Sequence, residues 1–304
     1  MNSLTQTDTE QTRADNGRTV LDVREVSHGY AAKRGGPVSY VLEDVSLTAQ
    51  AKEFISIVGP SGCGKSTLLR LISGLARPSR GEIIVQGAPI TPGRRDVGFI
   101  FQRDALLPWR TAGQNVQLAL KFRRMRPADA RRRALDWLDR FGLAGMADRY
   151  PHQLSGGQRK RVAIAATLVY EPDLLLMDEP FSALDVQTRD LIETDVLDAW
   201  EQSDRQTVAF VTHDLEEAIA MSDRVVVMSA SPGRIKSEYR IDLPRPRDIM
   251  DIRGTDAFRG YYERIWQDLR VEVQRRGRLG DAEPGPGAGS ASSTDPAADL
   301  RAAP

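Results

Sequence analysis

The 304-residue sequence has one cysteine, no net charge and no long apolar run. The single cysteine, Cys63, excludes an internal disulfide framework and indicates a reducing compartment. Every apolar run is shorter than the roughly 18 residues needed to span a bilayer, and the polar N-terminal stretch lacks the apolar segment of a secretory signal. Lys and Arg number 42, as do Asp and Glu, so no net positive field attracts nucleic acid. We therefore expect a cytoplasmic protein with no membrane span and no nucleic-acid partner.

Both ends of the chain have compositions that do not supply a hydrophobic core. Residues 1–18 are polar, and residues 279–304 are rich in Gly, Pro, Ala and Ser, so both are predicted to be disordered tails. Residues 246–278 contain FRGYYERIWQDLRVEV, whose apolar positions recur at helical spacing. We predict a C-terminal helical extension there, with the main domain in residues 19–245.

The main domain carries the pattern of an α/β fold. Two alternating runs within residues 19–50 predict antiparallel strands, and GEIIVQG predicts a strand in the same sheet as FISIV. The continuously apolar runs FISIV, LLLMD, TVAFV and RVVVM, with helical stretches between them, predict a mostly parallel sheet buried on both faces. Residues from about 104 to 160 lack strand runs and predict an inserted helical subdomain.

The stretch GPSGCGKST matches G-x-x-x-x-G-K-[ST] between an apolar strand and a predicted helix. Its glycines let backbone N–H groups surround a phosphate without obstruction by Cβ atoms. We expect Lys65 to reach the β- and γ-phosphates, and Ser66 to give its hydroxyl oxygen to Mg²⁺. The predicted nucleotide-binding residues of this loop are Gly59, Pro60, Ser61, Gly62, Cys63, Gly64, Lys65, Ser66 and Thr67.

The stretch LLLMDEP places two acids at the end of a buried strand. Asp178 is predicted to hold Mg²⁺, and Glu179 to act as general base toward the attacking water. The alternative is a pair that caps a helix, since acids favour helix N-termini. The phosphate loop already calls for a metal partner at such a strand end, which favours the first interpretation.

A second phosphate-binding arrangement lies in LSGGQRKRV. Ser155, Gly156 and Gly157 come just before apolar residues at helical spacing. A small hydroxyl, bare N–H groups and the positive end of a helix dipole together attract an anion. This second arrangement contains no lysine equivalent to Lys65.

The order GPSGCGKST, LSGGQRKRV, LLLMDEPFSALD resembles the ATPase subunit of an ATP-binding-cassette (ABC) system over about residues 20–240. The resemblance implies a P-loop NTPase fold with a mixed, mainly parallel sheet, an N-terminal antiparallel β subdomain and an inserted helical subdomain. In this family the LSGGQ of one copy closes over the γ-phosphate held by another copy. The lysine therefore comes from the other chain, and the implied partner is a second copy of this chain.

The resemblance also assigns roles to single positions. Gln102 matches the glutamine that senses Mg²⁺ and the γ-phosphate, and His213 matches the histidine that contacts the γ-phosphate. Tyr30 matches the aromatic that stacks on adenine, with Tyr40 as a rival. The implied sets are Glu179, His213 and Gln102 as catalytic residues, Ser66, Gln102 and Asp178 as metal ligands, and Ser155, Gly156, Gly157, Gln158 and Asp185 as the signature facing the partner's site.

One departure from the family pattern follows the LSGGQ motif. Where the family usually has Arg-Ala, this chain has Ala166 and Thr167. The lost arginine is expected to alter dimer contacts or rate. The phosphate, metal and water-activating positions are all filled, so the departure does not argue against activity.

Two stretches, LLPWRTAGQNV and SPGRIKSEYRIDLPRPR, resemble the nitrate, sulfonate and taurine importer branch. That branch implies ATP and Mg²⁺ as cofactors, transmembrane permease subunits and a solute-binding protein as partners, and a peripheral position on the cytoplasmic face of the inner membrane. We expect Leu106, Leu107 and Trp109 to line a groove for a permease helix, although Trp109 alternatively packs within the helical subdomain. The competing functions are a soluble ABC ATPase in DNA repair or translation, and an exporter.

Overall fold

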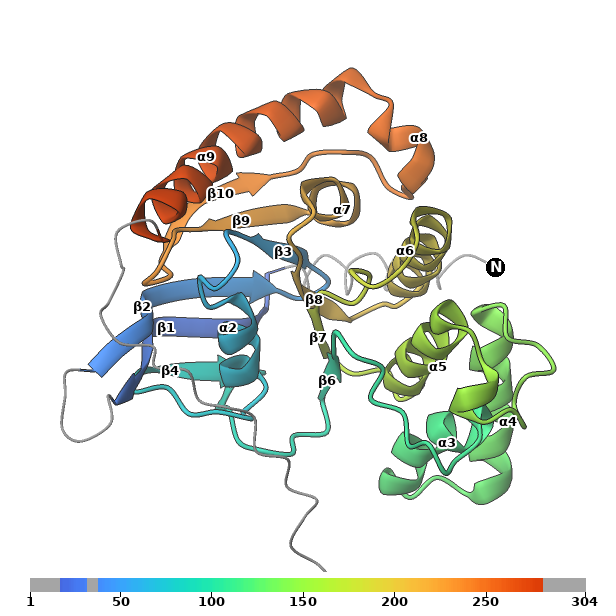
Figure 1. Ribbon diagram of the computed structural model, residues 1–304. Coiled ribbons are helices and arrows are strands. Elements are labelled where there is room, and N and C mark those ends of the chain that lie inside the picture. Colours follow the sequence, from blue (N-terminus) through green and yellow to red (C-terminus); the bar gives the residue numbers. More distant parts are fainter. Residues whose placement is uncertain (1–16, 32–37, 281–304) are drawn as a thin grey trace, which may run out of the picture.

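The computed structural model describes residues 17–31 and 38–280, which form two sheets with helices around them (Figure 1). The predicted tails fall mainly on residues 1–16 and 281–304, which lie outside the described residues. The antiparallel sheet has the order β2-β1-β4-β5 and consists of β2 (Val38–Gln50), β1 (Thr19–Ala31), β4 (Arg80–Val85) and β5 (Ala88–Pro89).

The second sheet has six strands in the order β10-β9-β3-β8-β7-β6. They are β10 (Ile235–Arg240), β9 (Arg224–Met228), β3 (Phe54–Val58), β8 (Thr207–Val211), β7 (Leu174–Asp178) and β6 (Val97–Ile100). All of its pairings are parallel except that of β10 with β9. A mixed, mainly parallel sheet beside an antiparallel one confirms the predicted fold class.

The placement of GEIIVQG in the same sheet as FISIV was wrong. Strand β4 pairs with β1 in the antiparallel sheet. The first three residues of β4 are exposed and its last three alternate between buried and half-buried, whereas β3 is buried at every position. A strand with one solvated face suits an antiparallel sheet, and a strand buried on both faces suits the centre of a parallel one.

The central strands divide their side chains between two apolar cores. Ile55 and Ile57 of β3 pack into the core between the sheets, while Phe54 and Val58 pack into the core under the helices. Strands β7 and β8 alternate in the same way. Because successive side chains of a strand point to opposite faces, a fully buried five-residue strand supplies both cores at once.

The helices surround the six-stranded sheet in separate groups (Figure 1). Helix α2 (Lys65–Ile72) follows β3 directly. The helical subdomain contains α3 (Ala112–Phe122), α4 (Pro127–Arg140), the short 3₁₀ helix η1 (Pro151–Gln153) and α5 (Gly156–Leu168). Within residues 17–31 and 38–280, none of the helices has the length and apolar character needed to cross a bilayer.

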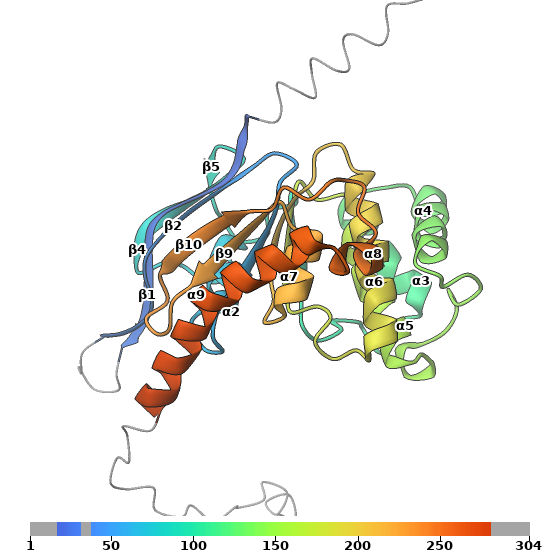
Figure 2. The ribbon, with the colours of Figure 1, turned by 90° about the horizontal axis from the view of Figure 1, so that it is seen from above.

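The C-terminal helices cover the edge of the molecule that holds β9 and β10 (Figure 2). They follow α6 (Val186–Glu201) and α7 (Leu215–Met221), and consist of α8 (Ile249–Arg253) and α9 (Asp256–Gly280). The buried guanidinium of Arg247 donates hydrogen bonds to five carbonyl oxygens, those of Ile219, Ala220, Ser222, Ile241 and Leu243. Arg247 therefore fixes the segment before α8 against the end of α7.

Two buried carboxyl groups lie between α6 and α7. Burial, together with the nearby charge of Glu217, raises the pKa of Glu193 to about 8. Burial also raises the pKa of Glu217 to about 7. Both groups therefore hold protons in the folded protein at pH values where a solvent-exposed glutamate is ionised.

This burial predicts a stability that falls with rising pH. The folded protein keeps a proton on Glu193 that the unfolded chain releases near the ordinary pKa of 4.5, so the free energy of unfolding decreases as the pH rises from there toward about 8. Glu193→Gln cannot ionise and is expected to lose less stability between pH 5 and pH 8. Urea unfolding at a series of pH values measures this. If the free energy of unfolding depended equally on pH in the wild-type and Glu193→Gln proteins, the raised pKa of Glu193 would be contradicted.

Candidate functional site

The candidate site lies where four parallel strands of the six-stranded sheet end. Because β3, β6, β7 and β8 run parallel, their carboxyl ends meet at one edge of the sheet. The phosphate loop follows β3, Gln102 follows β6, Asp178 ends β7, and His213 follows β8. The topology therefore gathers residues that lie far apart in the sequence.

The phosphate loop has a backbone that requires glycine. Gly62 and Gly64 have φ values of 77° and 100°, in the left-handed region. A Cβ atom on Gly64 would lie 2.5 Å from Cδ2 of Leu42, so any other residue there requires the Leu42 side chain to shift. Ser61 and Gly62 are exposed and Cys63 is buried, while Ser66 and Thr67 are half-buried on α2.

The start of α2 fits an anion. Gly64 is its N-cap and provides no capping side chain, and the first turn contains no acid. The first backbone N–H groups of a helix without a side-chain cap are available to a phosphate. Lys65 is buried, and its Nζ donates to the carbonyl oxygens of Gly59 and Pro60 at 2.8 and 3.1 Å. The hydrogen bonds of this cation thus go to backbone carbonyls rather than to carboxylates.

A pair of oxygen ligands lies beside the loop. Ser66 Oγ donates a hydrogen bond to Asp178 Oδ1 at 2.8 Å. Burial raises the pKa of Asp178, and the charge of Glu179 adds to this effect. Hydroxyl and carboxylate oxygens are the hard ligands that Mg²⁺ prefers, and a divalent cation offsets the cost of a buried carboxylate. Ser66 and Asp178 therefore fit the metal, whereas the Gln102 side chain contacts Glu179 instead.

The three predicted catalytic residues meet at Glu179. Its Oε2 lies 3.4 Å from Gln102 Nε2 and 3.2 Å from His213 Nδ1. Glu179 has a φ of 43°, a left-handed backbone that is uncommon for a residue with a side chain. Its N–H donates to the carbonyl oxygen of Val211 at 2.8 Å, which ties this backbone to β8. Strained residues held in this way cluster at functional sites.

The LSGGQ segment forms the N-terminus of α5 and lies apart from α2 in both views (Figures 1 and 2). Ser155 Oγ accepts from Gln158 N, and Gln158 Oε1 accepts from Ser155 N, at 3.2 and 3.0 Å. This capping box satisfies N–H groups at the start of α5. The corresponding N–H groups at the start of α2 have no side-chain cap. Ser155 and Gly156 are exposed.

Asp185 caps the neighbouring helix, α6. Its Oδ1 accepts a hydrogen bond from the N–H of Thr188 at 3.0 Å, and this bond lowers the pKa of Asp185. Thr188 also packs against Gly157 of the LSGGQ segment. The residues predicted to face a partner's site are therefore joined through Thr188.

Two residues that the sequence analysis missed hold the Gln102 segment. Lys160 on α5 is 2% exposed, and its Nζ donates to the carbonyl oxygens of Phe101 and Gln102 at 3.0 and 2.8 Å. Ser182 Oγ lies 3.3 Å from Gln102 Nε2 and donates to the carbonyl oxygen of Glu179. The sequence contains no signal for these contacts, because the partners are backbone atoms more than 50 residues from Lys160.

The two candidate adenine-stacking rings differ in exposure. Tyr30 is 59% exposed and packs edge-on against His28. Tyr40 is half-buried, with the Arg80 guanidinium 5.9 Å from its ring centre. Tyr30 offers the more accessible ring, and it remains the predicted stacking residue.

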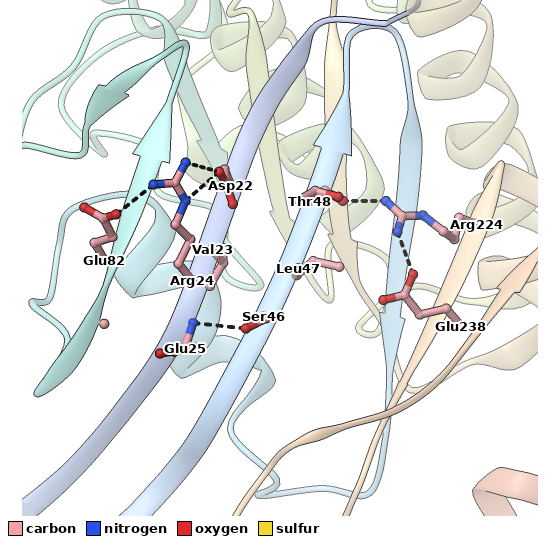
Figure 3. A pocket seen from close by; sticks show the side chains of 11 residues that line it. Asp22, Val23, Arg24, Glu25, Ser46, Leu47, Thr48, Glu82, Arg224 and Glu238 are labelled. Carbon is pink, nitrogen blue, oxygen red and sulfur yellow. Dashed lines mark hydrogen bonds and ion pairs between the residues drawn. The ribbon is translucent and has the colours of Figure 1, made fainter.

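A hollow of about 620 Å³ lies elsewhere, on the face of the antiparallel sheet near β10 (Figure 3). Its Arg24 pairs with Asp22 and Glu82, and its Arg224 pairs with Glu238. These arginines are compensated by carboxylates of the protein itself. The hollow is therefore not an anion site, and the phosphate-binding features lie at the sheet edge.

A glycine loop between a buried parallel strand and a helix, with an acid ending a nearby strand, defines a P-loop nucleoside-triphosphatase. A family model described as ABC transporter matches residues 42–182. The chain is 44% identical to the ABC transporter ATP-binding protein MJ0412 of Methanocaldococcus jannaschii over 232 residues, which are 76% of this chain and 85% of the relative. The chain belongs to the ABC transporter family, and it is an ATPase that forms the ATP-binding subunit of a transporter.

Further comparisons agree with this family. The chain is 40% identical to the aliphatic sulfonates import ATP-binding protein SsuB of Bacillus cereus, over 82% of this chain and 95% of the relative. The dimeric structure of the ATP-binding cassette MJ0796, in a post-hydrolysis state bound to ADP and Pi, has a TM-score of 0.66 at 34% identity. That match covers 74% of this chain and 100% of the other chain.

The close contact of Gly157 with α6 can be tested by comparing alanine substitutions at Gly157 and Gly156. A Cβ atom on Gly157 would lie 2.6 Å from Cγ2 of Thr188, whereas the nearest atom to a Cβ on Gly156 is 3.9 Å away. Gly157→Ala is expected to lower the free energy of unfolding by about 1–3 kcal/mol through overpacking. Gly156→Ala is expected to be neutral or stabilising, since alanine favours a helix.

Urea unfolding of the two variants measures the difference. Thr188→Ser removes the methyl group and is expected to restore the stability of Gly157→Ala. Equal stabilities for the two alanine variants would contradict the described packing of α5 on α6.

Proposed function

We propose that this chain is the ATPase subunit of an importer for a small anion such as nitrate, an aliphatic sulfonate or taurine. It acts as a homodimer on the cytoplasmic face of the inner membrane, bound to permease subunits that receive solute from a solute-binding protein. The convergence of Gln102 and His213 on Glu179, next to Ser66 and Asp178, is the observation that carries the hydrolytic role. The likeness to the sulfonate import protein supports the importer role.

The loop residues bind the triphosphate of the substrate. Lys65 and the N–H groups at the start of α2 contact the phosphates, and Tyr30 stacks on the adenine. Ser66 and Asp178 hold Mg²⁺, with Gln102 completing the set when nucleotide is bound. When bound there, Mg²⁺ would supply positive charge beside the phosphate oxygens.

Glu179 accepts the proton of the attacking water as general base. An ionised carboxylate only accepts hydrogen bonds, so the contact at 3.2 Å assigns the proton to His213 Nδ1. Gln102 donates to the same carboxylate oxygen, and the two contacts fix its orientation.

The exposed LSGGQ segment supports a site shared between two copies. Ser155, Gly156, Gly157 and Gln158 present a capped helix end without a lysine, and Asp185 begins the adjacent helix. Each copy supplies Lys65 to one nucleotide and this segment to the other. The nucleotide then stabilises the closed dimer through contacts that the open state lacks, and hydrolysis removes them.

A groove of about 300 Å³ beside the helical subdomain supports permease docking. Leu106 and Leu107 line it, whereas Trp109 is not among its lining residues and is 70% exposed. Ala166 and Thr167, where the family has Arg-Ala, also line this groove. The lost arginine therefore also bears on the proposed permease contact, and its expected effect on dimer contacts or rate stays a prediction.

The general base generates the first functional prediction. Glu179→Gln keeps the shape of the side chain but does not accept a proton, so ATP hydrolysis is expected to fall about 100-fold or more. ATP is then retained, and the closed dimer is expected to persist. Light scattering under saturating MgATP measures the dimer, with the exposed Glu171→Gln as the matched control. A purely monomeric Glu179→Gln protein under these conditions would contradict the shared site.

The groove generates a prediction about partners. Tagged purification from the native cells in mild detergent is expected to yield a multi-spanning membrane protein, identified by mass spectrometry. Leu118→Glu places a charge in the apolar groove and is expected to reduce that yield. Leu135→Glu, on α4 and partly exposed, is the matched control. Recovery of ribosomal or DNA-repair proteins instead would contradict the transport role.

A further inference from the structure

Within the C-terminal extension, Arg253 at the end of α8 bonds to side chains of α6 and approaches α7. Its Nη1 donates to Asp190 Oδ1 and its Nη2 donates to Glu193 Oε2, both at 2.7 Å. Its Nε lies 4.0 Å from Glu216 Oε2. Asp190 and Glu193 belong to α6 and Glu216 to α7, so the guanidinium joins three helices.

On the α7 side, this cluster holds the residues next to His213, whose own side chain is exposed. Thr212 Oγ1 donates to Glu217 Oε2 at 2.6 Å and accepts from the N–H of Asp214 at 3.0 Å. Arg189 Nη1 lies 3.4 Å from Asp214 Oδ2 and 3.8 Å from Glu217 Oε1. Thr212, immediately before His213, is therefore held by the buried carboxyl group of Glu217, and Asp214, immediately after it, is held by Arg189.

The same cluster also contains side chains of α6, the helix that Asp185 caps. Arg189 and Glu193 are four residues apart, so they lie on one face of α6. Glu193 is fully buried, and its ionisation is coupled to that of Glu217 across the helix interface. Two arginines, Arg189 from α6 and Arg253 from α8, thus flank a pair of buried carboxyl groups.

We infer that Arg253 is a positioning residue for His213. By tying Asp190 and Glu193 of α6 to α8 and approaching α7, Arg253 sets the separation of α6 and α7. That separation keeps His213 Nδ1 at 3.2 Å from Glu179 Oε2. The inference rests on the proposed roles of Glu179 and His213, and it gives the C-terminal extension a part in hydrolysis without contact to nucleotide.

Other residues anchor the extension independently of Arg253. Arg247 donates to five carbonyl oxygens at the end of α7 and in the segment after β10. Arg245 pairs with Glu201 and Asp223 and donates to the carbonyl oxygen of Met221. The loss of Arg253 therefore leaves the extension docked, and its effect on His213 is separable from unfolding.

The test compares Arg253→Met with Arg245→Met in the full-length chain. Arg253→Met is expected to lower kcat about tenfold, since a small misplacement of a catalytic group has effects of this size. KM for ATP is expected to stay unchanged, because the phosphate loop is not touched. Arg253→Lys keeps the charge and is expected to recover part of kcat, and Arg259→Met, at an exposed position of α9, serves as a further control.

Thermal unfolding of Arg253→Met and Arg245→Met places the two on a common stability scale. A lower kcat for Arg253→Met alone, at matched stability, supports the positioning role. An equal loss of kcat in Arg245→Met would overturn it, because any loosening of the extension would then suffice.

A double-mutant cycle with His213→Ala separates this inference from the proposed function. His213→Ala alone is expected to lower kcat, and Arg253→Met is expected to add nothing in that background, because both changes act through one group. A full additional loss in the double variant would overturn the inference while leaving the role of His213 intact. An unchanged kcat in His213→Ala would overturn the proposed role of His213, and this inference with it.

Discussion

The parallel pairing of β3, β8, β7 and β6 is the constraint on which the site depends. It brings the phosphate loop, Asp178, Glu179, Gln102 and His213 to one edge of a sheet, although Gly59 and His213 lie 154 residues apart in the chain. The strands hold this position because their side chains fill two apolar cores. The strained backbone of Glu179 is retained because its N–H is bonded to β8.

The two phosphate-binding segments are complementary. Helix α2 begins without a side-chain cap and carries a buried lysine, so it fits an anion but provides only one side of a site. Helix α5 begins with a capping box, exposed small residues and no lysine, and lies apart from α2. Each segment has what the other lacks, as the proposed homodimer with shared sites requires.

Sequence patterns predicted most strands of the fold but only part of the candidate site. Continuous apolar runs predicted β3, β7, β8 and β9, because strands buried on both faces have no polar alternation. They missed β6, which has only four residues, and β10, whose IKSEYR is charged on one face. The phosphate loop and Asp178 follow from motif and context, whereas Gln102 and His213 came from the family resemblance. Lys160 and Arg253 were missed because their partners are set by tertiary packing.

The most direct test of the shared site is ATP-dependent cross-linking between two differently marked chains. In a Cys63→Ala, Glu179→Gln background, one chain carries Ser61→Cys and the other Ser155→Cys, both at exposed positions. A short thiol cross-linker is added to the mixture with and without MgATP. The account predicts a mixed cross-linked dimer that forms with MgATP and that neither chain forms alone. The same yield with and without nucleotide would contradict it.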